Sequence, residues 1–212
     1  MNRPPEHRIT LVRHGRPTVR YSHTPWTWRT AREMNGLLDD YDLSGLDAGW
    51  NEPRAGNPIH AYPISSDLPR ALETAHLIAR RPDNLEVSAL FREVPVGRIP
   101  WQGLRLPTVS LLMICRLGWL TGLIPVSESR RQSRSRVRAA TDVLEERVGK
   151  HGDVALFSHG FFLWLVGREL RKRGWASPRV GPYRYLERIE FSRPAPLAVP
   201  SDHREGRRLV RT

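Results

Sequence analysis

The chain has 212 residues, a formal net charge of +12 and a single cysteine, Cys115. This length suits one domain with a sizeable core, while one cysteine excludes an internal disulfide framework and a multi-cysteine metal site. The positive charge is carried almost entirely by arginine, and it favours anionic partners such as phosphate esters, nucleic acid or acidic membranes without selecting one.

The first half of the chain alternates between strand-like and helix-like segments. The segment His7–Val12 is short and mostly apolar, which is typical of a strand. Thr30–Leu38 has some helical spacing, although glycines interrupt the region that follows. Ala61–Ser65 predicts a second strand, which leads into a helix at Leu68–Arg80 whose apolar residues recur at helical spacing. Leu85–Ala89 predicts a third, short strand.

The second half begins with an irregular and then apolar region over residues 91–125. A long charged helix is expected at Ser127–Lys150, followed by a buried strand at Asp153–Phe157 that is apolar without interruption. Phe161–Arg173 predicts another helix, and Tyr183–Phe191 alternates enough to be a last strand.

This alternation predicts an α/β fold, a three-layer sandwich in which helices flank both faces of a mainly parallel central sheet. We expect a single domain over residues 1–192, with about 93–126 as a lid or insertion. Residues 193–212 are expected to form a basic tail rich in proline and arginine. The N-terminus has no apolar run, and charges interrupt the apolar stretch at 104–124, so we expect no transmembrane segment and a cytoplasmic location.

Two of the predicted strands end in a histidine that is followed by glycine, at His14 and His159. Because ligands bind at the carboxyl ends of strands in such sheets, both histidines are expected to open onto one crevice. Gly160 begins a helix, whose free backbone N–H groups can contact an anion. Arg13 and Arg70 end or follow strands at the same edge, and their guanidinium groups match phosphate oxygens. The sequence therefore predicts a phosphoryl-transfer site.

Four stretches together resemble the histidine phosphatase superfamily, the phosphoglycerate mutase-like family. Leu11–Gly15 resembles its Arg-His-Gly signature, and Ser65–Ala75 is a near-complete copy of its Ser-Ser-Asp-Leu-x-Arg-Ala-x-x-Thr-Ala motif. Leu90–Gly97 resembles the segment that carries a glutamate acid, and Ser158–Gly160 resembles the second histidine motif. The order and spacing agree with the family from about residue 8 to residue 170.

The resemblance implies a role for each matching residue. His14 would be the nucleophile that becomes phosphorylated, and Arg13, Arg70 and His159 would bind the phosphoryl oxygens. Glu93 would protonate the leaving oxygen and later activate water. The mechanism that the resemblance implies needs no metal and no cofactor.

Two further residues are candidates for phosphate binding from their positions alone. Arg16 lies two residues after His14 and can add positive charge to the pocket, while Gly160 can offer backbone N–H groups. The other histidines are scattered and set up no spacing typical of metal ligands. We therefore expect no metal site.

The chain departs from the family pattern beside these motifs. No asparagine follows Arg-His-Gly within Arg16–Tyr21, and the stretch after Glu93 is longer than usual and lacks a second acid. The apolar segment Leu111–Ile124 stands where family members carry an insertion that covers the substrate. It can pack in the core or in a lid, or it can form an apolar surface that binds a partner, a lipid or a hydrophobic substrate.

The leading hypothesis is a hydrolase, a phosphomonoesterase that acts on a small phosphorylated molecule or a phosphoprotein. A phosphoglycerate mutase-like phosphotransferase is the alternative within the same chemistry, although the chain is short for the mutases. A non-catalytic protein that binds phosphate esters is a second class. The arginine content suggests nucleic acid as a third class, but no nucleic-acid-binding motif supports it. The oligomeric state stays open.

Overall fold

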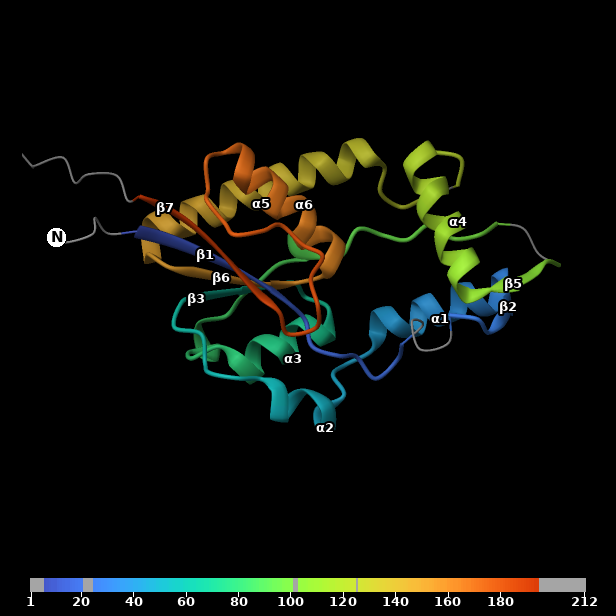
Figure 1. Cartoon of the computed structure of the whole chain (residues 1–212), viewed down its shortest axis with the longest axis horizontal. Coiled ribbons are helices and arrows are strands. Elements are labelled where there is room, and N and C mark those ends of the chain that lie inside the picture. Colours follow the sequence, from blue (N-terminus) through green and yellow to red (C-terminus); the bar gives the residue numbers. More distant parts are fainter. Residues whose placement is uncertain (1–5, 21–24, 101–102, 125, 195–212) are drawn as a thin grey trace, which may run out of the picture.

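The computed structural model describes residues 6–20, 25–100, 103–124 and 126–194. Within them, five strands form one sheet in the order β4-β3-β6-β1-β7 (Figure 1). Their bounds are β1 (Glu6–Arg13), β3 (Tyr62–Ser65), β4 (Glu86–Val87), β6 (Val154–Ser158) and β7 (Arg188–Pro194). The first four run parallel, and β7 pairs antiparallel with β1 at the edge.

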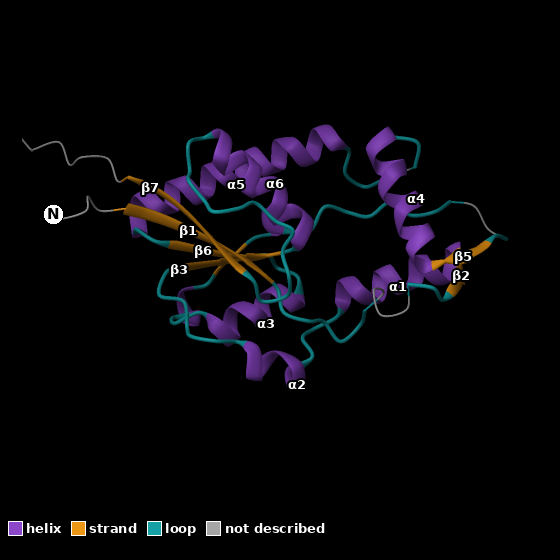
Figure 2. Cartoon of the chain, viewed as in Figure 1, coloured by secondary structure: helices purple, strands orange, loops and turns teal. Residues whose placement is uncertain are grey.

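Helices cover both faces of this sheet, as Figure 2 shows. The α-helices are α1 (Ala31–Leu43), α2 (Ala48–Asn51), α3 (Pro69–Ile78), α4 (Thr108–Thr121), α5 (Arg130–His151) and α6 (Gly160–Lys172). Side chains of α5 and α6 pack on one face of the sheet and those of α3 on the other. The predicted three-layer α/β sandwich is therefore confirmed.

Strand β6 lies in the middle of the sheet and is buried over its full length. Val154 and Leu156 belong to the core beneath α5 and α6, whereas Ala155 and Phe157 belong to the core beneath α3. Successive side chains of a strand point to opposite faces, so a strand covered on both faces is apolar at every position. This is why its sequence is a continuous apolar run.

A second, smaller core lies beyond the carboxyl ends of the strands. Met34 and Leu38 of α1 pack there with Leu111 and Cys115 of α4. Next to this pair, β2 (Trp28–Thr30) and β5 (Arg105–Pro107) form a two-stranded antiparallel sheet. The region that was expected to be irregular and then apolar thus contains a strand and a helix (Figure 1). Leu111 and Cys115 pack on α1, whereas Phe91, Val94 and Trp119 belong to the core of the main sheet.

The bounds of the last strand differ from the prediction. The last strand begins at Arg188 rather than Tyr183, and it continues through Arg193 and Pro194 because Pro194 pairs with Glu6 of β1. Arg193, expected to begin the tail, instead lies 4.6 Å over the ring of Trp175. The remainder of the predicted tail, 195–212, lies outside the described residues.

Candidate active site

His14 follows β1 directly and is buried, with 1% of its surface exposed. Its Nδ1 lies 2.7 Å from the carbonyl oxygen of Gly15, to which it donates a hydrogen bond. Because a carbonyl can only accept, this bond places the ring proton on Nδ1 and leaves a lone pair on Nε2. The hydroxyl of Tyr41 lies 3.5 Å from that Nε2. His14 therefore presents a nucleophilic nitrogen.

His159 stands at the start of α6, and its ring centroid lies 5.1 Å from that of His14. The Nε2 of His159 and the hydroxyl oxygen of Ser66 are 3.0 Å apart. The same hydroxyl accepts the N–H of Leu68. Ser66 therefore holds the orientation of the second histidine, and the other ring nitrogen of His159 is left for a different partner.

Arg13 is the last residue of β1 and is partly buried. Its Nη1 donates to the carbonyl oxygen of Tyr183 at 2.6 Å, and its guanidinium carbon lies 4.4 Å from the ring centroid of Tyr185. A Cβ atom at Gly160 would lie 3.3 Å from Arg13 Nε. Gly160 thus provides room for the guanidinium group, in addition to its predicted contact with an anion.

Arg70, in the first turn of α3, is completely buried. Its Nη1 donates to the carbonyl oxygens of Tyr41 and Asp42 at 2.8 and 3.2 Å. A carboxylate oxygen of Asp42 lies 3.5 Å from Nη2. The ring of Tyr41 packs against the guanidinium group, with 4.4 Å between the guanidinium carbon and the ring centroid. The Nη1 atom of the guanidinium group is therefore bound to the end of α1.

Several buried nitrogen atoms of these side chains have no hydrogen-bond partner within the part of the chain that the structure describes. They are Arg13 Nε, Arg70 Nε, Arg70 Nη2 and His159 Nδ1. A buried donor without a partner costs about 1–3 kcal/mol. An anion with several acceptor oxygens, such as a phosphoryl group, would supply partners for the arginine donors, and for His159 Nδ1 when the Ser66 hydroxyl donates to Nε2.

Burial shapes the acid–base properties of both histidines. Desolvation lowers the pKa of His14 well below its ordinary value, and the charges of Arg13 and Arg70 lower this pKa further. Desolvation is also the main reason that the pKa of His159 is well below its ordinary value. Both rings are therefore neutral near pH 7, which is the state that a nucleophilic His14 requires.

The carboxylate of Glu93 lies against the first turn of α6 and accepts hydrogen bonds from backbone N–H groups. Oε1 accepts the N–H groups of Val94 and Phe162, each at 2.9 Å, and Oε2 accepts the N–H of Phe161 at 3.2 Å. The first N–H groups of a helix lack partners within the helix, so a carboxylate is favourable there. Glu93 thus lies beside His159, and no hydrogen bond joins it to either site histidine among the described residues.

Arg16 is engaged away from the two histidines. Its guanidinium group forms an ion pair with Asp47 and lies 4.8 Å from the ring centroid of Trp50. Its backbone N–H donates to the side-chain oxygen of Asn51 at 2.7 Å. The predicted contact of Arg16 with phosphate stays a prediction: Asp47 pairs with one end of the guanidinium group, and the buried Nε has no hydrogen-bond partner among the described residues.

The turn after His14 is held by residues that the sequence did not single out. The Asn51 side chain bonds both the N–H and the carbonyl of Arg16, and a Cβ at Gly15 would lie 2.3 Å from Asn51 Oδ1. Gly15 is therefore needed for close approach to Asn51, whereas the sequence suggested approach to a ligand. The N–H of Gly15 donates to Thr74 Oγ1 at 2.9 Å, so the threonine of the eleven-residue motif anchors this turn.

Two tyrosines also belong to the site and were missed. Tyr41 reaches it from α1, and the ring of Tyr185 lies 5.7 Å from that of His14. Neither lies in a motif, and isolated tyrosines in polar segments give no signal of function. Asn51 had one indirect signal, because the family's usual asparagine was missing after His14 and a different segment supplies an amide.

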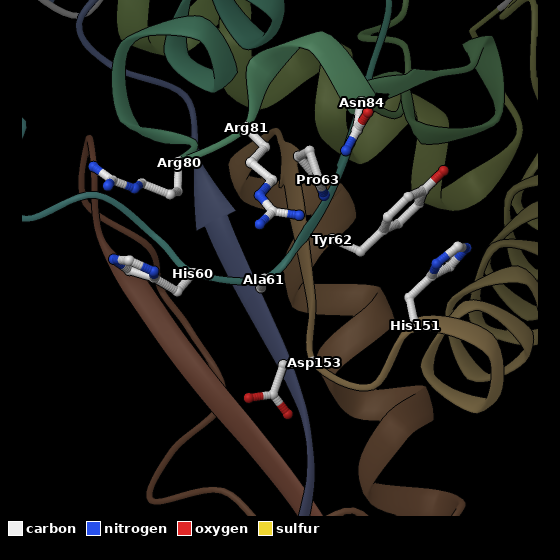
Figure 3. A pocket seen from close by; sticks show the side chains of 9 residues that line it. All are labelled: His60, Ala61, Tyr62, Pro63, Arg80, Arg81, Asn84, His151 and Asp153. Carbon is white, nitrogen blue, oxygen red and sulfur yellow. The ribbon is translucent and has the colours of Figure 1, made fainter.

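A separate cavity of about 760 Å³ lies at the opposite, amino-terminal ends of the strands. Figure 3 shows Arg81, Tyr62 and His151 around it, and the two rings stack with their centroids 3.9 Å apart. The arginine and the histidine are exposed there. This cavity shares no residue with the site around His14.

No group of three or more histidine, cysteine, aspartate or glutamate side chains that could hold a metal ion occurs among the described residues. The prediction that the site uses no metal rests on the sequence.

The sequence was also compared with models of known protein families and with curated proteins. Residues 9–185 match the family model of the histidine phosphatase superfamily (branch 1). No curated protein matches the sequence at a significant level.

Solved structures with the same fold include phosphatases and a mutase. A mycobacterial glucosyl-3-phosphoglycerate phosphatase is 20% identical, with a TM-score of 0.56 over 88% of this chain and 90% of that one. A phosphoglycerate mutase from Bacillus anthracis is 17% identical, with a TM-score of 0.56 over 90% and 89%. TTHB049 from Thermus thermophilus is 19% identical, with a TM-score of 0.54 over 86% and 92%. At these identities the likeness shows the fold.

Proposed function

The chain belongs to the histidine phosphatase superfamily (branch 1), and we propose that it is a phosphatase that forms a phosphohistidine on His14. The observation that carries this proposal is the set of buried nitrogen atoms of Arg13, Arg70 and His159 that have no hydrogen-bond partner among the described residues, beside a neutral histidine. The substrate is a phosphate monoester, either a small molecule or a phosphoprotein.

In the first step, the phosphoryl group binds between Arg13, Arg70 and His159. The lone pair on Nε2 of His14 attacks phosphorus, the N–P bond forms, and the ester P–O bond breaks. The two arginines neutralise the charge that builds up on the phosphoryl oxygens. The carbonyl of Gly15 holds the Nδ1 proton of His14 throughout and so stabilises the positive charge of the phosphorylated ring.

Glu93 supplies the proton that the leaving oxygen needs. Its Oε2 accepts only the N–H of Phe161, at 3.2 Å, and is the oxygen to which we assign the proton transfer. After the alcohol leaves, the same carboxylate removes a proton from water, whose oxygen attacks the phosphohistidine. The N–P bond breaks, inorganic phosphate is released, and His14 returns to its neutral form.

The test is to measure phosphoenzyme and free phosphate together, in EDTA, with an aryl phosphate and with a panel of alkyl phosphates. Wild type is expected to form an acid-labile, base-stable phosphoryl adduct and to release phosphate. His14→Ala is expected to lose both, with turnover reduced by about 10⁴-fold or more. His151→Ala is the matched control, because it removes an exposed histidine at the other end of the sheet.

The outcomes separate the competing functions. Phosphate that moves within a substrate without being released would identify a phosphotransferase of the mutase type. Affinity for phosphate esters without an adduct or turnover would identify a binding protein. Turnover that survives His14→Ala would refute the proposed nucleophile.

A further inference from the structure

Helix α4 is apolar on all sides, and one of these sides is uncovered. Arg116 is the only charged residue in its fourteen. Leu111, Cys115 and Trp119 are buried, whereas another set of side chains is exposed. We call this set the apolar strip: Met113 (59% exposed), Leu117 (54%), Leu120 (41%) and Leu123, just after the helix (83%). Positions 113, 117 and 120 are neighbours on a helix surface, so the strip is continuous along α4.

A row of arginines on α5 begins where this strip ends. Arg130, Arg134 and Arg138 are exposed and recur every four residues, which places them on one side of the helix. Arg130 Nη1 donates to the carbonyl oxygen of Leu120 at 2.8 Å, so the row adjoins the strip directly. None of the three forms an ion pair with a carboxylate among the described residues.

A groove of about 440 Å³ joins the two features. Trp119, Leu120 and the three arginines are among the residues that line it. Trp164 of α6 contributes an aromatic wall, and the guanidinium carbon of Arg168 lies 4.8 Å from the centroid of its ring. The groove therefore combines apolar and aromatic side chains with cationic ones, and Glu169 is the one acidic residue that lines it.

Exposed tryptophans lie near the other end of α4. Trp26 is 75% exposed and Trp28 is 59% exposed. The N–H of Thr108, the first residue of α4, donates to the carbonyl oxygen of Thr27 at 2.9 Å, which places this segment against the helix start. Tryptophan is enriched where proteins meet the interface of a membrane.

We propose that the apolar strip and the arginine row form a binding surface for an anionic lipid bilayer. The aliphatic side chains enter the boundary between headgroups and acyl chains, and the arginines contact the acidic headgroups. Helix α4 lies in the plane of the interface, since its fourteen residues are fewer than the roughly 20 that a spanning helix needs. No helix in the described part of the chain is long and apolar enough to cross a bilayer.

Charge selects this partner over the others. A second copy of the chain in a two-fold dimer would bring two strongly cationic surfaces together, because four arginines and a lysine line the groove against a single carboxylate, Glu169. A nucleic acid would pair with the arginines but would leave the apolar strip in water. An acidic bilayer satisfies both features, and the net charge of +12 attracts the whole molecule to it.

The experiment is co-sedimentation of the full chain with vesicles of phosphatidylcholine alone or with one third phosphatidylglycerol. Binding is expected to the acidic vesicles only and to weaken as salt is raised. The double variant Leu117→Ser, Leu120→Ser is expected to bind at least about tenfold more weakly, because two leucines no longer enter the bilayer. Arg134→Glu with Arg138→Glu is expected to lose binding to a similar extent.

The matched controls change the same residue types elsewhere. Val87→Ser removes an exposed apolar side chain of β4, and Arg80→Glu with Arg81→Glu reverses two exposed charges at the amino-terminal end of the sheet. Both are expected to bind as wild type does. All four variants change exposed positions, and circular dichroism checks that each one is folded.

Several results would overturn the proposal. These are no binding to acidic vesicles, equal binding to both vesicle types, or undiminished binding by either surface variant. Sedimentation velocity that shows a dimer in wild type and a monomer in the leucine variant would assign the strip to a second copy of the chain. Because the readout is binding, the result does not depend on phosphatase activity.

Discussion

The two ends of the central sheet carry the same residue types in different environments. At the carboxyl ends, His14, His159 and Arg70 are buried, and several of their nitrogens have no partner among the described residues. At the amino ends, His151 and Arg81 line an open cavity and are exposed to water (Figure 3). Water solvates the second group, whereas an anion with several acceptor oxygens would supply partners for the first. Burial and geometry, rather than residue type, therefore distinguish a candidate catalytic site from a cationic surface.

The largest effect is expected when one arginine at each end of the sheet is replaced by alanine and the two variants are compared. Arg70→Ala is expected to lower kcat/KM by about 10³-fold, because a donor aimed at the developing phosphoryl charge is lost. Arg81→Ala is expected to change kcat/KM by less than about twofold. Steady-state kinetics with one aryl phosphate compares the two variants directly.

Arg70 also links α3 to the end of α1, so Arg70→Ala could lose activity through a folding defect. A second variant separates that effect from the loss of phosphate binding. Arg70→Lys keeps the charge but loses the planar fork, and it is expected to lose about 10²-fold. Equal losses in Arg70→Lys and Arg81→Ala would remove the distinction between the two ends.

A smaller effect is expected from the glutamates. Glu93→Gln is expected to lower kcat by about 10²-fold on alkyl phosphates, because the leaving alkoxide is no longer protonated. The loss is expected to be smaller on an aryl phosphate, whose leaving group needs less protonation. Glu86→Gln, which breaks an ion pair with Arg147 on the far side of the sheet, is the control and leaves kcat unchanged.

A loss in Glu93→Gln that is the same for both leaving groups would mean that Glu93 acts only by capping α6. Thermal unfolding of the variant measures that capping contribution separately.

Acid is expected to destabilise the fold through the two buried histidines. Burial lowers their pKa in the folded protein, so below the ordinary value of 6.5 the unfolded chain binds protons that the folded chain does not. The free energy of unfolding then falls by up to about 1.4 kcal/mol per pH unit for each histidine, and this effect vanishes above about pH 6.5. Urea unfolding between pH 5.5 and 7.5 measures the slope.

His14→Asn is expected to reduce that slope by about half, because one of the two buried titrating groups is removed. An unchanged slope in this variant would show that the acid sensitivity arises elsewhere in the chain.

The smallest effect is expected from inorganic phosphate. At ten times its dissociation constant, phosphate is expected to stabilise wild type by about 1.4 kcal/mol, because it binds only the folded chain. Arg70→Lys is expected to need more phosphate for the same rise in Tm, and Arg81→Ala is expected to respond as wild type does. If Arg81→Ala lost the stabilisation by phosphate, the anion would bind in the open cavity and not at His14.

Much of the fold and part of the site could be predicted from local patterns. Strand β6 was recognised because burial on both faces demands an uninterrupted apolar sequence, and α3 because its apolar residues follow helical spacing. The end of β7 was misplaced because the pairing of Pro194 with Glu6 joins opposite ends of the chain. No local pattern encodes such a pairing.

Within the site, Glu93 and Asn51 make contacts that local sequence patterns do not predict. The motif indicated an acidic group at Glu93, but its contact with the start of α6 joins residues about 70 positions apart. Asn51 holds the turn after His14 from 35 positions away and carries no motif. Arg16 was a candidate because it is close to His14 in sequence, and its ion pair with Asp47, 31 positions away, is a contact that no local pattern indicates.

The sequence by itself determined that His14 and His159 lie at the same edge of the sheet, because a histidine that directly follows a strand must lie at that strand's carboxyl end, and parallel strands align these ends. The tertiary structure decided which of those groups are left without partners and which side of α4 is left uncovered. Those properties depend on contacts between residues that are distant in the chain, and burial, which sets the pKa of His14 and the exposure of Leu117, exists only once those contacts form.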